Sequence, residues 1–297
     1  LGNAFKSLGQ LDAAVKSYEK ALTFKSDHEN AHNNLGNVLS DLGQLDAAVK
    51  CYKKALAIKP EYTEAHSNLG NAFKELGQLD DAVKFYEKVL SLSPHNAETY
   101  SNLGLTLQEL GQLEEAVKCY KNALTINPDY AEAHNNLGNV LKDLGRLEES
   151  IVHYQKALAI QPDLAEGHIN LGLTLQELGR LDAAVSSYQK AIVVKPDYAK
   201  AHSNLGNALQ ELGRMDGAIP HYHKAIQINP NYAEAYNNLG NTLRKLGRLE
   251  EAIACYHKAL AVKPDFAEGH SNLGTALKDL GKLDEAVARY RKARSRK

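Results

Sequence analysis

The sequence predicts an all-α solenoid, in which one antiparallel helix pair is repeated from one end of the chain to the other. Two glycines and a tyrosine recur with a period of 34 residues, as Gly36, Gly43 and Tyr52 do in one period. The first glycine of each period is Gly2, Gly36, Gly70, Gly104, Gly138, Gly172, Gly206, Gly240 or Gly274. Such a period is typical of stacked helix pairs that contact only their neighbours, so the chain presents an extended surface instead of a closed pocket.

The segment 131–164 shows how each period builds two helices. Its residues are numbered here from position 1 at Ala131 to position 34 at Leu164, and the same positions apply to every repeat. Apolar residues at positions 3, 7, 11 and 14 form one face of a first helix, and those at positions 17, 21, 24 and 28 form one face of a second. Gly145 at position 15 is expected to end the first helix, because glycine readily adopts the left-handed conformation of helix ends. Pro162 ends the repeat.

Extended along the chain, this unit predicts a single array over residues 1–297. A partial repeat over 1–28 comes first, and a last repeat or cap over 267–297 ends the array. The full repeats between them are 29–62, 63–96, 97–130, 131–164, 165–198, 199–232 and 233–266. In the last unit Arg294 and Arg296 replace apolar residues, which is typical of a terminal cap with a polar outer face, so we expect no ordinary repeat to follow.

Composition and charge argue against several classes of function. The formal net charge is −1, so no strong field draws the chain to nucleic acid. No run of about 18 apolar residues is present to cross a membrane. Cys51, Cys119 and Cys255 share one position in repeats that are too far apart for a disulfide within the chain, which favours a reducing, cytoplasmic location.

Histidines and acidic pairs do not predict a metal or catalytic site. Six of the twelve histidines recur at position 4, one to a repeat, where buried packing is the expected role because metal ligands must converge on one ion. Acidic pairs such as Glu114 and Glu115 lie near the starts of second helices, where they complement the helix dipole. No phosphate-binding, dinucleotide-binding or zinc-protease motif is present. We therefore expect no catalytic residue, no metal and no cofactor.

Asparagine recurs at position 6 in every repeat that contains this position, although it is a poor helix former. These asparagines are Asn34, Asn68, Asn102, Asn136, Asn170, Asn204, Asn238 and Asn272. Position 9, one helical turn further, adds Asn37, Asn71, Asn139, Asn207 and Asn241, with Asn3 in the partial repeat. Leu105 and Leu173 interrupt position 9 and could form an apolar patch for a partner side chain.

We call the asparagines at positions 6 and 9 the asparagine ladder. A carboxamide both donates and accepts hydrogen bonds, so a row of them could hold the backbone of an extended peptide whatever its side chains. Two other interpretations stay open. The asparagines could bond to one another or to nearby backbone and only rigidify the array, or they could form a solvated face.

The repeat resembles the tetratricopeptide repeat over the whole chain. Units such as AHSNLGNAL and AYNNLGNTL are similar to the repeats of the O-linked N-acetylglucosamine transferases and their relatives. The resemblance implies a right-handed superhelix with first helices on its concave side, and peptide contacts by the position-6 asparagines. Position 5 is never lysine, so the carboxylate-clamp pattern of chaperone-binding relatives is missing.

We therefore expect a non-enzymatic module that binds extended protein or peptide segments in a concave groove, with no nucleic-acid or membrane partner. The alternative is a substrate-recruiting arm of a larger enzyme, whose glycosyltransferase, sulfotransferase or methyltransferase domain lies outside these residues. Homo-oligomerisation through the convex or end surfaces is a third hypothesis.

Overall fold

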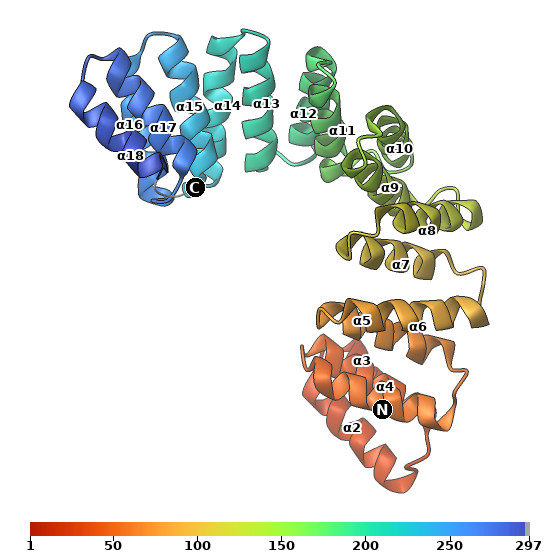
Figure 1. The fold of residues 1–297 in the computed structure, drawn as a ribbon. Coiled ribbons are helices and arrows are strands. Elements are labelled where there is room, and N and C mark those ends of the chain that lie inside the picture. Colours follow the sequence, from red (N-terminus) through yellow and green to blue (C-terminus); the bar gives the residue numbers. More distant parts are fainter. Residues whose placement is uncertain (295–297) are drawn as a thin grey trace. The chain divides into compact units, whose positions relative to one another are not determined.

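The protein is built from α-helices joined by short turns, as the ribbon of its computed structural model shows (Figure 1). Residues 1–294 are described. The first helix of each repeat is called the A helix and the second the B helix. The A helices are α1 (Gly2–Ser7), α3 (Glu29–Asp41), α5 (Thr63–Glu75), α7 (Ala97–Glu109), α9 (Ala131–Asp143), α11 (Ala165–Glu177), α13 (Ala199–Glu211), α15 (Ala233–Lys245) and α17 (Ala267–Asp279). The B helices are α2 (Leu11–Phe24), α4 (Leu45–Ile58), α6 (Leu79–Leu92), α8 (Leu113–Ile126), α10 (Leu147–Ile160), α12 (Leu181–Val194), α14 (Met215–Ile228), α16 (Leu249–Val262) and α18 (Leu283–Arg294).

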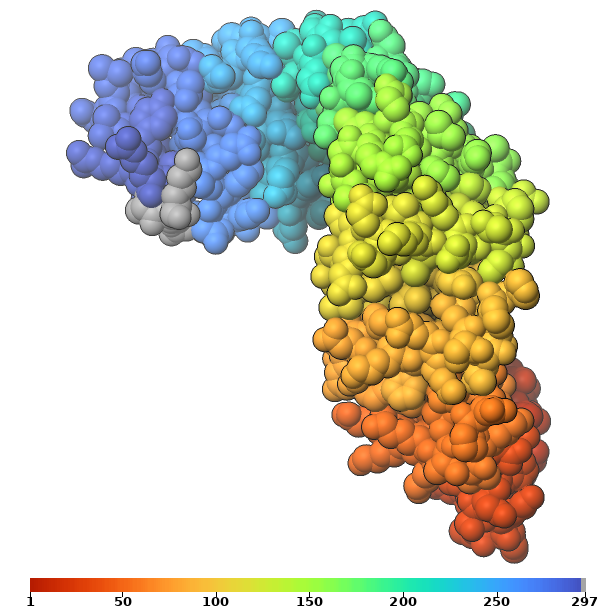
Figure 2. Space-filling model, turned by 45° about the vertical axis from the view of Figure 1, so that its right-hand side comes forward, coloured from red at the N-terminus to blue at the C-terminus, as the bar shows by residue number. Residues whose placement is uncertain are grey.

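The chain forms two compact units, residues 1–149 and 150–297, and each is described by itself. Within a unit, each A helix packs on the B helix of its own repeat, and that B helix packs on the next A helix. Successive A helices also touch, as α3 and α5 do in the first unit and α13 and α15 in the second. Repeats therefore follow one another as adjacent bands of the surface within each unit (Figure 2). This arrangement confirms the predicted α-solenoid of antiparallel helix pairs.

Glycine at position 15 ends each A helix, as the sequence predicted. Gly43 has a φ of 73°, in the left-handed region, and its N–H donates to the Ser40 carbonyl at 2.8 Å. The N–H of the following residue, Gln44, donates to the Leu39 carbonyl at 2.8 Å. These two bonds make a Schellman motif, which satisfies carbonyls that the helix end leaves unpaired. The expected helix end at Gly145 is confirmed by its φ of 73°.

A glycine at position 8 lets the two helices of a repeat approach closely. A Cβ atom added to Gly36 would lie 2.5 Å from Cε1 of Tyr52, so only glycine leaves room for the tyrosine ring. The ring of Tyr52 is 2% exposed, and its counterparts in most later repeats are fully buried. A repeat that lies within one unit is therefore centred on a glycine–tyrosine contact, and the tyrosine hydroxyl lies between its two helices, towards the A helix.

The sequence also predicted a polar C-terminal cap and no membrane-spanning segment. Arg294, in the predicted cap, is exposed at the end of α18, whereas Arg296 lies outside the described residues. Among residues 1–294, no helix combines the length and the apolar content that a membrane span requires.

Candidate functional site

The asparagine ladder lies on the A helices. Positions 6 and 9 are three residues apart, so their side chains share one face of the helix. All the asparagines at position 6 are half-buried, and so are those at position 9 from Asn37 onwards. Because successive A helices touch within each unit, these side chains reach from one repeat to the next.

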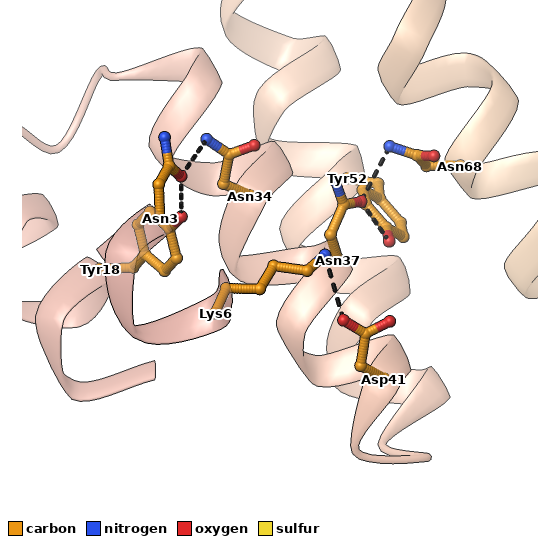
Figure 3. A network of polar contacts seen from close by, with 8 residues as sticks. All are labelled: Asn3, Lys6, Tyr18, Asn34, Asn37, Asp41, Tyr52 and Asn68. Carbon is orange, nitrogen blue, oxygen red and sulfur yellow. Dashed lines mark hydrogen bonds and ion pairs between the residues drawn. The ribbon is translucent and has the colours of Figure 1, made fainter. Parts of the chain in front are cut away.

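A single amide oxygen joins three helices at a regular junction of the ladder (Figure 3). Oδ1 of Asn37 on α3 accepts a hydrogen bond from the Tyr52 hydroxyl on α4 at 2.9 Å. The same oxygen accepts a second bond from Nδ2 of Asn68 on α5, also at 2.9 Å. The ladder therefore ties the A helix and B helix of one repeat to the A helix of the next.

The same junction recurs in the second unit and at the start of the chain. Oδ1 of Asn207 accepts from the Tyr222 hydroxyl at 2.8 Å and from Nδ2 of Asn238 at 3.0 Å. At the first junction the Tyr18 hydroxyl donates to Oδ1 of Asn3. The bond from Asn34 to that oxygen is long, at 3.5 Å. The internal bonding that the sequence left as an alternative is therefore present.

Where position 5 is asparagine, a glutamate at position 2 of the next repeat can fix the orientation of the amides. Nδ2 of Asn33 donates to Oε1 of Glu64 at 2.9 Å, and a carboxylate can only accept. Asn33 must then turn its oxygen to Asn68, whose Nδ2 lies 3.0 Å away. That nitrogen also faces Asn37, so Asn37 presents its oxygen and Tyr52 is the donor. In the second unit, Asn237 and Glu268 repeat the first of these contacts at 3.0 Å.

Internal bonding uses only half of each carboxamide at a regular junction. Asn68 and Asn238 donate through Nδ2, which leaves Oδ1 without a hydrogen bond among the described residues. Asn37 and Asn207 accept through Oδ1, which likewise leaves Nδ2 without one in the described part of the chain. One acceptor and one donor thus remain at each junction, and these are the groups that pair with the N–H and C=O of a peptide unit.

The other predicted asparagines occupy equivalent places. Asn71 and Asn241 accept from Tyr86 and Tyr256, at 2.7 and 2.8 Å. Asn272 donates to Oδ1 of Asn237 at 3.0 Å. Asn102, Asn139 and Asn170 are half-buried on α7, α9 and α11.

The two leucines at position 9 break the pattern. Leu105 replaces the acceptor of Tyr120, and the buried hydroxyl of Tyr120 has no partner among the described residues. Leu173 replaces the acceptor of Tyr188, whose hydroxyl donates to Oε1 of Gln176 at 2.8 Å instead. The position-6 asparagines of the following repeats, Asn136 and Asn204, also lack the acceptor that asparagine at position 9 would provide.

A second set of contacts between repeats borders the ladder. A side chain at position 12 reaches the acidic residue at position 13 of the next repeat, as in Lys6 and Asp41 at 3.1 Å (Figure 3). Arg244 and Asp279 do the same at 3.1 Å, and Gln176 and Glu211 at 2.5 Å. Lysine, arginine and glutamine all donate, so each of these three residue types at position 12 can make the contact.

Histidines at position 4 hold the turns between repeats. Nε2 of His66 lies 2.8 Å from the carbonyl oxygen of Pro60 in the preceding turn. A carbonyl only accepts, so Nε2 carries the proton and donates. The same contact is made by His32, His134, His168, His202 and His270, all at least nine-tenths buried. These histidines are therefore structural.

Family models match most of the chain. The model described as the cilia and flagella-associated protein 70 C-terminal domain matches residues 28–238. A model described as TPR repeat matches residues 2–43 and 240–281, and one described as tetratricopeptide repeat matches 271–297. The chain belongs to the tetratricopeptide repeat (TPR) family. No curated protein matches it.

Several solved structures resemble this TPR array. MamA is 31% identical over 54% of this chain and 94% of its own, with a TM-score of 0.50. A second MamA structure is 30% identical over 56% of this chain and 91% of its own, with a TM-score of 0.51. YrrB, described as a TPR protein with an unusual peptide-binding site, is 25% identical over 63% of this chain and 96% of its own, with a TM-score of 0.53.

Sequence reasoning missed three members of the TPR site. The tyrosine at position 24 was expected only in the core, yet its hydroxyl is a donor of the ladder. Asn33 at position 5 and Glu64 at position 2 were not singled out as partners. Their signal was present in the spacing, since an asparagine at position 5 and a glutamate 31 residues later recur as Asn237 and Glu268.

Proposed function

We propose that this TPR array is a protein-interaction module that binds an extended polypeptide segment along its A helices. The observation that carries the proposal is the donor and acceptor left at each regular junction of the ladder. A donor and an acceptor lie together at such a junction, so the segment is bound through its backbone and specificity among side chains is broad. Repeat arrays of this kind use extended surfaces for binding, and YrrB, a similar array, is described as having a peptide-binding site.

Asn207→Asp tests the proposal without removing the internal junction. Aspartate keeps an oxygen for Tyr222 and Asn238, so both bonds at the junction persist. It replaces the free Nδ2 donor with a carboxylate oxygen, which repels a peptide carbonyl. The matched control is Gln210→Glu, which adds the same charge one turn away and keeps the acceptor that Thr242 uses at 2.6 Å.

The probe is a set of peptides selected from a random peptide library on the wild-type chain, with affinity measured by fluorescence anisotropy. We expect Asn207→Asp to weaken binding by about tenfold, the equivalent of about 1.4 kcal/mol, with an unchanged unfolding midpoint. Gln210→Glu should stay within about twofold of the wild type. Equal affinity of the wild type and Asn207→Asp would refute a role for the ladder in binding.

The alternative of a substrate-recruiting arm uses the same face. In that case the bound segment belongs to the substrate of a catalytic domain, and the Asn207→Asp result applies unchanged. The mass of the native polypeptide separates the two, because a fused transferase adds several hundred residues.

A further inference from the structure

We propose that the two leucine interruptions of the ladder are the positions at which it binds a peptide most strongly, through a carboxamide whose nitrogen has lost its internal acceptor, beside an apolar contact. This inference rests on the proposed function and names where on the A helices the binding free energy is concentrated. The occupant is an extended polypeptide segment with an aliphatic side chain at the interruption.

The first step is the loss of internal bonding at the interruption in the second unit. Asn204 on α13 stands where Asn238 stands one repeat later, and Asn238 gives its Nδ2 to Asn207. The corresponding neighbour of Asn204 is Leu173 on α11, which has no acceptor. Nδ2 of Asn204 is accordingly buried without a hydrogen-bond partner among the described residues.

The second step is the freedom that this loss gives the carboxamide. Asn68 and Asn238 are held in one orientation by their internal bonds. No such bond opposes rotation of the Asn204 amide about χ2, a torsion with a broad energy profile. Rotation brings Nδ2 out from beside Leu173, and both ends of the amide can then pair with one peptide unit. A regular junction cannot do this, because each of its amides has one end committed.

The third step is the apolar contact. Leu173 is half-buried against the core and keeps part of its side chain accessible. An aliphatic side chain of the bound segment can bury that remainder, which a regular junction with asparagine at position 9 does not offer. The site thus combines a backbone pairing with a preference for one class of side chain.

The first unit holds a second instance of the same arrangement. Leu105 on α7 precedes Asn136 on α9 and offers no acceptor to its Nδ2, while Oδ1 of Asn136 lies a long 3.5 Å from Nδ2 of Asn135. Tyr120 beside Leu105 has a buried, unpartnered hydroxyl that an asparagine at position 9 would satisfy. In both units, therefore, leucine stands where asparagine would add internal hydrogen bonds.

The decisive variant is Leu173→Asn, which restores the regular junction. It should raise the thermal unfolding midpoint, because Asn204 regains its acceptor. It should also lower the affinity for the selected peptides by about tenfold. Stability and affinity then move in opposite directions. Asn204→Leu is the second variant, since it removes the unpartnered amide at similar volume. It should retain the fold and also weaken binding about tenfold.

The probe is the same selected peptide set, and peptides with their aliphatic residues changed to serine are measured beside it. If Leu173→Asn and Asn204→Leu both bind the peptides as tightly as the wild type or more tightly, while Asn207→Asp binds them more weakly, this inference is overturned and the proposed function stands. If Asn207→Asp also leaves affinity unchanged, the proposed function fails with it. Equal affinity for the serine-substituted peptides overturns the aliphatic preference.

Discussion

The hydroxyl of Tyr52 and Oδ1 of Asn37 are 2.9 Å apart, and this bond places a core tyrosine in the asparagine ladder. The tyrosine ring fills the space left by Gly36, while its hydroxyl crosses to the A helix. One residue thus connects the packing of a repeat with the polar face on which partners are expected to bind.

The tyrosine hydroxyl should stabilise a repeat only where it finds an acceptor. Tyr52→Phe removes the bond to Asn37 and should lower the free energy of unfolding by about 0.5–1.5 kcal/mol. Tyr120→Phe is the matched control, because that hydroxyl is buried without a partner in the described chain. It should be neutral or stabilising. Urea denaturation followed by circular dichroism checks both, and an equal loss in the two variants would contradict the junction.

The glycine at position 8 should not tolerate a side chain. In Gly172→Ala the new Cβ would lie 2.5 Å from Cε1 of Tyr188, and overpacking of this kind costs about 1–3 kcal/mol. Gly217→Ala is the control within a helix, since the nearest atom to its Cβ is 3.9 Å away. It should raise stability by about 0.5–1 kcal/mol, because alanine favours helix. Thermal melts of both variants measure the difference, and a harmless Gly172→Ala would argue against the close approach.

The cysteine thiols should react slowly while the protein is folded. Burial raises the pKa of Cys119 to about 11 and also raises the pKa of Cys51 and Cys255 above the ordinary value. The thiolate is the reactive form, so little of it is present at pH 8. Labelling with Ellman's reagent should be slowest at Cys119, which is 8% exposed, and complete in denaturant. Rapid labelling of folded Cys119 would contradict its burial.

Stability should fall in mild acid through His221. The pKa of His221 lies below its ordinary 6.5, chiefly because the side chain is buried and secondly because of the charge of His202. The Nδ1 atoms of the two histidines are 3.4 Å apart. Between that lowered pKa and 6.5 the unfolded chain binds more protons, so stability is complete above 6.5 and decreases as pH falls through this window. Urea midpoints at pH 7.5 and 5.5 should differ less in His221→Ser than in the wild type. Serine already stands at this position as Ser187.

The helix pairs could be predicted from the sequence, because position 15 needs a residue that adopts the left-handed conformation and position 8 needs a residue without a side chain. Both requirements are local and recur as Gly43 and Gly36. The place of the asparagine ladder was also predictable from helical periodicity. Its internal bonds were not, because the contact of Asn37 with Asn68 depends on how close two A helices pack. The unpartnered Nδ2 of Asn204 follows only once that contact is known.

The amide junctions also bear on how the array unfolds. Each regular junction adds a coupling term between neighbouring repeats, so opening one repeat breaks bonds that its neighbour shares. At Leu105 and Leu173 that term is absent, so we expect lower cooperativity there than at a regular junction. Within each unit, the repeats that flank the interruption are the ones expected to separate first, and amide hydrogen exchange would detect a local opening before global unfolding.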